Sequence, residues 1–579
     1  MDNRRLFLFA ALILVAFLIY QAWMHDYGPK PPPPGAPTAA ATTAPSAATA
    51  ALPQIPAAPG STPVATAHAA QSAAAPTRGI RAQAAGQPME VRTDLLAVTI
   101  NTTGGELQQA ELLAYPQELH QPARVSALNP DPANLLVAQS GLQTHSGPAA
   151  PGDSALYTAN QTHYQLAPGQ KTLEVALSWK SPTGLTVEKT YTFTRGSYQV
   201  DLRYEVHNGS AQAWSGAAYA QFASRYNINL PHGLFASMFS MHRYDYQRMA
   251  LDGSGGYQQF EFKDLADKPV NITSPGGWTA VVTHYFLIAV IPGEHNANNL
   301  YYTQSLGDER YLVGTIGSLK TVAPGANASF SDRFYLGPKL QTLLPKVAPG
   351  LQLTVDYGKF TIIAEPLFKL LNFLHGLVGN WGWAIILLTV LVKLVFFPLN
   401  HVAFRSMAKM RAVQPRLKAL QERYKDDKQK LAQAQMEFYK KEKINPLGGC
   451  LPMIIQLPIF FALYYVLVYS VELRQQPWIL WIHDLSAPDP YFILPIIYGL
   501  AYFLQAHVQP QITTDKMQQR LFKFMPLIFV AFYAVFPSGL VLYYLPNSIL
   551  TIAQQWWINH TYDAEGKRRQ RDKSLKSKK

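Results

Sequence analysis

The chain has 579 residues, enough for several domains, since a domain commonly has about 100–150 residues. Hydrophobic residues make up 48% and charged residues 15%, below the roughly 25% of a typical soluble domain, which indicates contact with lipid. The single cysteine, Cys450, excludes a disulfide within one chain and a cysteine-based zinc cluster. Most of the net charge of +13 lies in 401–450 and 559–579, which predicts that both stretches are cytosolic.

The first apolar run extends from Leu6 to Trp23, within residues 1–28, and follows Arg4 and Arg5. Eighteen helical residues span about 27 Å, close to the roughly 30 Å of a hydrocarbon core, so the run predicts a transmembrane anchor. A cleaved signal peptide is the alternative, although its apolar segment is usually only about 7–15 residues long. Residues 29–88 are rich in proline and alanine, which predicts a disordered linker.

Residues 89–345 place apolar side chains at every second position between glycine and proline turns, most clearly in 173–179, 187–193 and 198–206. This period of two predicts antiparallel strands with one buried face. A region of about 250 such residues predicts a large β-sandwich. Its histidines and aspartates are scattered, and we interpret them as ordinary surface or core residues.

Residues 346–579 are predicted to form a helical membrane core. In 359–378, Lys369, Asn372 and His375 recur every three residues among apolar neighbours, which predicts an amphipathic helix lying in the membrane interface, with Pro366 at its first position. The juxtamembrane end of the next span is the alternative. Apolar stretches predict transmembrane helices at about 381–399, 451–470, 490–507, 521–536 and 539–558. The predicted fold is a membrane α-helical bundle of six transmembrane helices, five of them forming the core, plus a large antiparallel β-sandwich domain.

The charges of the loops predict the orientation of these spans. Because basic residues favour the cytosolic side, both termini, the loop 401–445 and the tail 559–579 are predicted to be cytosolic, and the β-sandwich to lie outside the cytosol. The loop 401–445 is predicted to be a helical hairpin, since Met410, Val413 and Leu417 follow a spacing of three and four residues that Leu431 and Phe438 continue.

Basic residues coat this hairpin and the tail. They are candidates for contact with anionic lipid headgroups, ribosomal RNA or a partner protein, with a merely solvated charged face as the alternative. The candidates are Arg405, Lys409, Arg411, Arg416, Lys418, Lys567, Arg568 and Arg569.

Lys393 lies inside the predicted span 381–399, where a charge costs about 2.5–3.5 kcal/mol on insertion scales and is a functional candidate. The alternative is that its side chain reaches along the helix towards the cytosolic surface. Thr389 is one turn earlier on the same face. Polar residues in the other spans predict a hydrated cavity open to the cytosol, or direct hydrogen bonds between helices as the alternative. These residues are Gln456, Gln505, Tyr543, Tyr544, Asn547, Ser548, Thr551, Gln554 and Gln555.

The sequence contains no Ser/His/Asp order, phosphate loop or HExxH motif, so we predict no covalent catalysis, no cofactor and no metal. Several short motifs instead resemble the YidC membrane protein insertases. They are Asn445 to Pro452, Gln456 to Phe460, Trp481 to Ser486 and Phe536 to Tyr544. The N-terminal anchor and the large β domain are similar to those of the Gram-negative members, in which that domain is periplasmic.

The resemblance implies a protein of the bacterial inner membrane that inserts nascent membrane proteins and assists their folding. It implies action alone or beside the Sec translocon, often from a ribosome bound at the basic loop and tail, without a nucleotide. It also implies a hydrophilic groove with one positive charge. Lys393 matches the position of that charge, where the family usually has arginine. The positive charge is therefore kept, but the guanidinium that could donate two parallel hydrogen bonds to one carboxylate is lost. Thr389, Tyr543 and Tyr544 match positions that line the path, and we add Gln456, Gln505 and Ser548.

Two other classes of function remain open from the sequence. A secondary transporter would also place polar residues at the middle of the membrane, but Lys393 is the one charge deep within the predicted spans and no inverted repeat is evident. An envelope structural protein could instead use the β domain to bind a polysaccharide or a partner.

Overall fold

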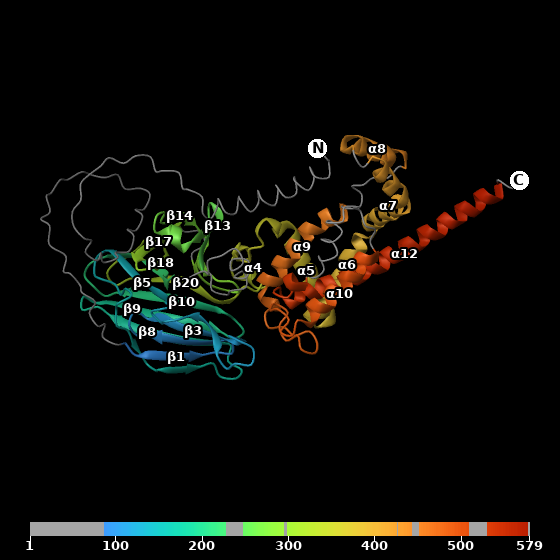
Figure 1. Cartoon of the computed structure of the whole chain (residues 1–579). Helices are drawn as coiled ribbons and strands as arrows, with labels where there is room; N and C mark the ends of the chain where they lie inside the picture. Colours follow the sequence, from blue (N-terminus) through green and yellow to red (C-terminus); the bar gives the residue numbers. More distant parts are fainter. Residues whose placement is uncertain are drawn as a thin grey trace, which may run out of the picture. The chain divides into compact units, whose positions relative to one another are not determined.

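The structure is a computed structural model that describes residues 86–226, 247–293, 298–424, 427–442, 451–508 and 530–576. The predicted anchor, nearly all of the predicted linker and most of the span predicted at 521–536 lie outside the described residues. The chain divides into two compact units (Figure 1). The β unit contains the described residues up to Asp356 together with Tyr469–Glu472, and the helical unit contains Tyr357–Val468 and the described residues after Glu472.

The β unit consists of two large sheets whose neighbouring strands are antiparallel, except for β1 and β7, which are parallel. The first sheet has eleven strands. In spatial order they are β14 (Asn271–Pro275), β17 (Asn298–Gly307), β18 (Arg310–Ile316), β11 (Trp214–Arg225), β5 (Leu136–Ser146), β3 (Glu106–Pro116), β2 (Leu96–Asn101), β1 (Pro88–Arg92) and β7 (His163–Gln165), with β19 (Lys320–Val322) beside β11 and β4 (Arg124–Leu128) beside β3.

The second sheet has nine strands. In spatial order they are β13 (Gly256–Glu261), β12 (Arg248–Gly253), β15 (Trp278–Val282), β16 (Phe286–Pro292), β20 (Asn327–Pro338), β10 (Gln199–Asn208), β9 (Leu185–Thr194), β8 (Thr172–Lys180) and β6 (Thr158–Ala159). A short helix, α3 (Phe262–Leu265), follows β13.

The alternation predicted for β8, β9 and β10 is confirmed by their burial. Val187, Tyr191 and Phe193 on β9 are buried while Glu188 between them is exposed, as a strand with a period of two requires. The two sheets meet through aromatic side chains, since the ring centroids of Phe222 on β11 and Phe334 on β20 lie 6.0 Å apart. The β unit is therefore rich in antiparallel sheet, with its main core between two sheet faces.

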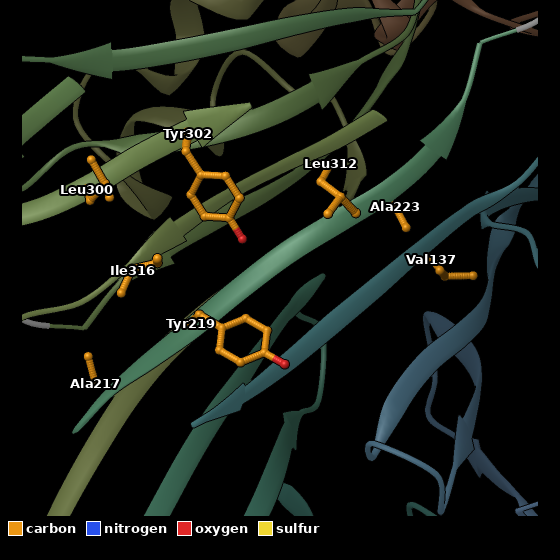
Figure 2. Packing of buried hydrophobic residues seen from close by; sticks show 8 residues of the cluster. All are labelled: Val137, Ala217, Tyr219, Ala223, Leu300, Tyr302, Leu312 and Ile316. Atoms are coloured by element: carbon orange, nitrogen blue, oxygen red, sulfur yellow. The ribbon is translucent and has the colours of Figure 1, made fainter. Parts of the chain in front are cut away.

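The prediction that strands bury only one face is wrong for β11. Its side chains from Trp214 to Ser224 are all buried. On the face opposite Phe222, Tyr219 of β11 lies in a hydrophobic cluster together with Tyr302 of β17 (Figure 2). This strand is central in its sheet, and on the face that points away from the other sheet its side chains pack beside those of the same sheet's strands β5, β17 and β18.

The chain after β20 stays with the β unit. It forms α4 (Leu344–Val347) and the 3₁₀ helix η2 (Leu351–Thr354). The indole nitrogen of Trp278 donates to the carbonyl of Pro349 at 3.0 Å, and the buried ammonium of Lys339 donates to the carbonyl of Thr354 at 3.2 Å. The backbone N–H of Gln341 donates to Glu472 at 2.9 Å, so the segment Tyr469–Glu472 is also part of this unit.

The helical unit begins with η3 (Gly358–Phe360) and α5 (Thr361–Val378). The other helices are α6 (Trp381–Val395), α7 (Phe397–Arg423), α8 (Lys428–Lys441), α9 (Leu451–Tyr469), α10 (Ile493–Val508) and α12 (Ser538–Lys576). The short 3₁₀ helix η5 (Val471–Leu473) follows α9 and begins in the segment assigned to the β unit. The long helix α12 extends from the bundle as one continuous element (Figure 1). Pro366 lies inside α5 and not at its first position, because the helix already begins at Thr361.

The span predicted at 381–399 is not one straight helix. α6 ends at Val395, and Trp381–Val395 meets Phe397–Met410 at a bend of 64°. Pro398 lies in the first turn of α7, a position that suits its fixed φ and its missing N–H, so it favours a new helix start. The apolar run continued through this break, which is why hydropathy alone placed the end of the span too late.

Helix length and composition give fewer candidate spans than six within the described residues. Among the described helices, only Gly358–Val378, predicted to lie in the interface, is long and apolar enough to cross a membrane. The bent pair Trp381–Val395 and Phe397–Met410 also qualifies if the two helices are taken as one span. Gln456–Tyr469 and Ile493–Ala506 are apolar but shorter. The count of six transmembrane helices therefore remains a prediction.

Candidate functional site

Lys393 lies in the last turn of α6 and faces α12. Asn380 caps the start of α6, because its side-chain oxygen accepts from the backbone N–H of Trp383 at 3.2 Å. The Lys393 ammonium donates to Thr551 Oγ1 at 2.6 Å and to Asn547 Oδ1 at 3.4 Å, and both acceptors are on α12. The cation is thus half-buried between two helices.

The two partners of Lys393 are neutral. Thr551 donates its own hydroxyl proton to the carbonyl of Asn547 at 2.6 Å, which leaves its oxygen free to accept from the ammonium. Within the part of the chain that the structure describes, no carboxylate forms an ion pair with Lys393. The positive charge is therefore solvated by hydroxyl and amide oxygens and is not cancelled by a negative one.

Thr389 is almost fully buried, at 1% exposed, between the same two helices. Its hydroxyl donates to the carbonyl of Ile385 at 2.8 Å, one turn earlier in α6, and lies 3.4 Å from the carbonyl oxygen of Tyr543 on α12. Thr389, predicted to line the substrate path, thus forms a packing contact between α6 and α12.

The aromatic residues of the predicted site join α12 to its neighbours. Gln456 of α9 donates to the Tyr543 hydroxyl at 3.3 Å. The ring of Tyr544 lies 5.4 Å from that of Phe460 on α9 and 6.2 Å from that of Tyr498 on α10. These contacts bring α9, α10 and α12 together around an aromatic cluster.

Two further predicted residues differ in their placement. Ser548 is buried on α12, at 3% exposed. Gln505 is half-buried on α10, and among the described residues no hydrogen bond joins it to the other predicted site residues. The structure thus joins Lys393, Thr389, Gln456, Tyr543 and Tyr544 through contacts with or on α12, and Gln505 takes no part in the hydrogen bonds given for them.

Several polar atoms of α12 are buried without a hydrogen-bond partner among the described residues. They are the hydroxyl oxygen of Tyr544, the side-chain oxygen of Gln554 and both amide atoms of Gln555. An unsatisfied polar group costs about 1–3 kcal/mol when it is removed from water. Direct hydrogen bonds between helices, the alternative to a hydrated cavity, are present as well, from Lys393 and Gln456 to α12.

The cytosolic hairpin predicted at 401–445 corresponds to α7 and α8. Met410, Leu417 and Tyr439 form its buried seam, with Val413 and Phe438 packed against it. Tyr439 was not predicted in this seam, because the expected spacing placed its neighbour Phe438 there.

The basic residues predicted for ribosome, partner or lipid contact are only partly visible. Arg405 is exposed on α7 and Lys409 is half-buried. Arg416 is exposed and pairs with Glu442 across the hairpin at 3.1 Å. The side chains of Arg411, Lys418, Lys567, Arg568 and Arg569 lie outside the described residues.

Asn547 and Thr551 touch Lys393 directly but were named only as polar residues of the last span. The signal was present in the sequence, since they are four residues apart and therefore share one face of a helix. Nothing local showed that this face meets α6, because Thr551 lies 158 residues after Lys393.

Comparison with known proteins identifies the family. Residues 88–370 match the family model described as the YidC periplasmic domain, and residues 373–565 match that of the 60Kd inner membrane protein. The membrane protein insertase YidC of Nitrosococcus oceani is 44% identical over 573 residues, which cover 98% of this chain and 100% of that protein. The insertase YidC of Thioalkalivibrio sulfidiphilus is 43% identical over 577 residues, which cover 98% and 100%.

Among solved structures, a crystal structure of an active YidC insertase with its first transmembrane domain resolved is similar, with 19% identity and a TM-score of 0.37, over 81% of this chain and 94% of that chain. The curated relatives are named as membrane protein insertases and not as enzymes. Both family models and the full-length identity show that this chain belongs to the YidC family of membrane protein insertases.

Proposed function

We propose that this insertase uses Lys393 as a transient electrostatic attachment point for acidic residues in the polar tail of an incoming membrane protein. The tail enters a hydrophilic groove that is open to the cytosol and to lipid. Six spans place both termini in the cytosol and the β unit in the periplasm. The apolar span of the substrate then leaves the groove sideways into the bilayer, along the aromatic side chains near Tyr544.

The observation that carries this proposal is the state of the Lys393 ammonium. It is held by two neutral oxygens, at 2.6 Å and 3.4 Å, and no carboxylate of the described residues pairs with it. A half-buried cation with only neutral partners retains its attraction for a mobile carboxylate. Two charges 4 Å apart attract by about 4 kcal/mol at an effective dielectric constant of about 20, before the cost of desolvation.

The physical requirement for insertion agrees with this role. A polar segment that crosses bare hydrocarbon leaves backbone groups unsatisfied, at several kcal/mol each. A polar interior shortens that path, and a fixed cation lowers the energy of an acidic tail part of the way across. Release follows when burial of the apolar span in lipid outweighs the attraction, so no covalent step or nucleotide is needed.

The basic residues of the hairpin and tail are proposed to hold the ribosome or anionic lipid, and the Sec translocon is a proposed partner for larger substrates. Exposed Arg405 is the best-defined member of this set. Arg416 contributes less, because Glu442 already offsets its charge.

The test uses the purified full chain in vesicles and single-span substrates that differ only in an acidic or a neutral tail. Lys393→Ala should lower insertion of the acidic-tailed substrate by about tenfold, the value of one partly solvated charge pair, and leave the neutral one nearly unchanged. Lys393→Arg should retain the preference. Lys369→Ala, on α5, is the matched control, since that lysine pairs with Glu365 at 2.7 Å. Equal losses for both tails would contradict the electrostatic role.

A further inference from the structure

The loop between α9 and α10 contacts the first turns of three helices. We call Gln475–Asp489 the collar loop. Asn380, which caps α6, donates to the carbonyl of Pro477 at 3.1 Å. The backbone N–H groups of Ser538 and Gly539, which begin α12, donate to the carbonyls of Ala487 and Leu485 at 2.7 Å and 2.9 Å.

Asp489 fixes the collar loop to the third helix, α10. One carboxylate oxygen accepts from the backbone N–H of Leu494 at 2.7 Å. The other accepts from the indole N–H of Trp481 and from the backbone N–H of Tyr491, both at 3.0 Å. Asp489 is only 1% exposed, so these neutral donors are what stabilise its buried carboxylate.

Asp484 closes the collar loop on itself and joins it to α12. Its Oδ1 accepts from the backbone N–H of Gln475 at 3.0 Å, and from the backbone N–H and hydroxyl of Ser486 at 2.8 Å and 2.6 Å. Its carbonyl accepts from the hydroxyl of Ser538 at 2.8 Å, and Ser538 is fully buried. Loss of the Asp484 side chain therefore loosens the loop at the point where α12 is attached.

The contacts of the collar loop leave little room for movement of α6 or α12. A Cβ added to Gly382, in the first turn of α6, would lie 2.1 Å from Cδ1 of Trp478. One added to Gly539 would lie 3.0 Å from the carbonyl oxygen of Leu485. At Gly382 the Trp478 ring approaches more closely than a side chain would allow, and at Gly539 the contact is tight, so both contacts restrict the axial positions of the two helices at this end.

The fixed ends determine what meets deeper in the bundle. Lys393 lies twelve residues after Trp381, and Thr551 lies thirteen residues after Ser538. At 1.5 Å per residue these are depths of about 18 Å and 20 Å from the collar loop. A slip of one residue between the helices, about 1.5 Å, would shift Thr551 Oγ1 by more than half of its 2.6 Å distance from the Lys393 ammonium, and so change the geometry of their hydrogen bond.

We propose that the collar loop positions the two helices that carry the Lys393 site, with Asp484 as its principal positioning residue. The inference rests on the proposed function of Lys393, because the site that the loop aligns is that one. Asp484 touches no substrate and acts only through the register of α6 against α12.

The test measures insertion in vesicles with the acidic-tailed and neutral-tailed substrates. Asp484→Ala should lose most of the preference for the acidic tail, about tenfold, with insertion of the neutral tail within about twofold of the unmodified chain. Asp484→Asn keeps an acceptor oxygen and should restore the preference. Glu365→Ala, an acidic residue of α5 that pairs with Lys369, is the control and should change neither substrate.

A double-variant cycle separates positioning from general damage. If Asp484 acts through Lys393, the pair Asp484→Ala with Lys393→Ala should lose no more than Lys393→Ala alone. The positioning role would be overturned if the loss in the double variant were the product of the two single losses. It would also be overturned if Asp484→Ala lowered insertion of both tails equally. If Asp484→Ala does not accumulate as folded protein, Ser538→Ala takes its place, because it removes only the hydrogen bond from the Ser538 hydroxyl to the Asp484 carbonyl. Ser538→Ala should lower the preference for the acidic tail by about threefold, and the same criteria apply to it.

The outcomes distinguish this inference from the proposed function. If Lys393→Ala shows no dependence on tail charge, the proposed function of Lys393 fails. If Lys393→Ala shows that dependence while neither Asp484→Ala nor Ser538→Ala does, the positioning role of the collar loop fails and the function of Lys393 stands.

Discussion

Replacing Lys189 with methionine should remove the pH dependence that this side chain gives to the stability of the β unit. Lys189 is fully buried on β9. Its ammonium donates to the carbonyls of Gly104, Gly105 and Ser140 at 2.8 Å, 3.0 Å and 3.0 Å. The rings of Tyr157, Tyr191 and Tyr204 lie 5.7 Å, 5.3 Å and 5.5 Å from it.

The magnitude follows from the pKa of Lys189. Burial lowers this pKa from 10.5 to about 7, although Glu106 and Asp153 favour the charged form. Between pH 7 and 10.5 the native state has released the proton that the unfolded state still binds, so the free energy of unfolding rises with pH. From pH 7 to pH 9 the gain from this one group is about 2 kcal/mol, and the same amount is lost as the pH falls from 9 to 7.

Pulse proteolysis of the full chain in urea, followed through the fragment of the β unit, gives the free energy of unfolding at each pH. The unmodified chain should gain about 2 kcal/mol relative to Lys189→Met between pH 7 and pH 9. A constant offset between the two profiles is expected, because methionine leaves three carbonyls without their donor. Parallel profiles would refute the reasoning, since they would mean that the three carbonyls and three rings keep the ammonium charged.

Three other predictions concern single contacts. Burial raises the pKa of Glu472 from 4.5 to about 7. The unmodified β unit should therefore lose stability relative to Glu472→Gln as the pH rises from 4.5 through 7. A difference in the free energy of unfolding that did not change with pH would be inconsistent with a buried carboxyl group. Gly277 has φ +95°, and an added Cβ would lie 2.1 Å from the carbonyl oxygen of Asp252. Gly277→Ala should therefore lower the free energy of unfolding by more than about 2 kcal/mol in the same proteolysis assay, and a neutral effect would contradict this close approach of the two backbone segments. Arg416→Ala should lower the free energy of opening of α8, measured by amide hydrogen exchange, by less than about 1 kcal/mol, because the Arg416 side chain of its pair with Glu442 is exposed. The effect should be smaller still at high salt. A larger effect would show that the pair organises the hairpin.

The strands could be predicted where their pattern is local. Val187, Tyr191 and Phe193 are two or four residues apart, and the period of two is enough to place them on one face. The same pattern put Lys189 on that face but gave no reason for a buried lysine. Its acceptors belong to segments 49 to 85 residues away, which no local pattern reveals.

The helices show the same limit. Apolar runs indicated where helices lie, but hydropathy does not register a helix end inside an apolar run, so the break at Phe396 was missed. Lys393 was recognisable because a charge within an apolar run is rare. Its partner Thr551 depends on the packing of α6 against α12. The collar loop gave a family resemblance through Trp481 to Ser486 but no sign of its contacts, since these use backbone groups, the loop side chain of Asp484 and the hydroxyl of Ser538 at the start of α12.

Reversal of the charge at position 393 is the most direct test of the electrostatic role. Lys393→Glu would be reconstituted in vesicles and given single-span substrates with acidic, neutral or basic tails. An electrostatic attachment point predicts that insertion of the acidic tail falls, that of the neutral tail is nearly unchanged, and that of the basic tail rises above its value with the unmodified chain. If the three substrates keep the same order of insertion with Lys393→Glu as with the unmodified chain, Lys393 does not act through its charge.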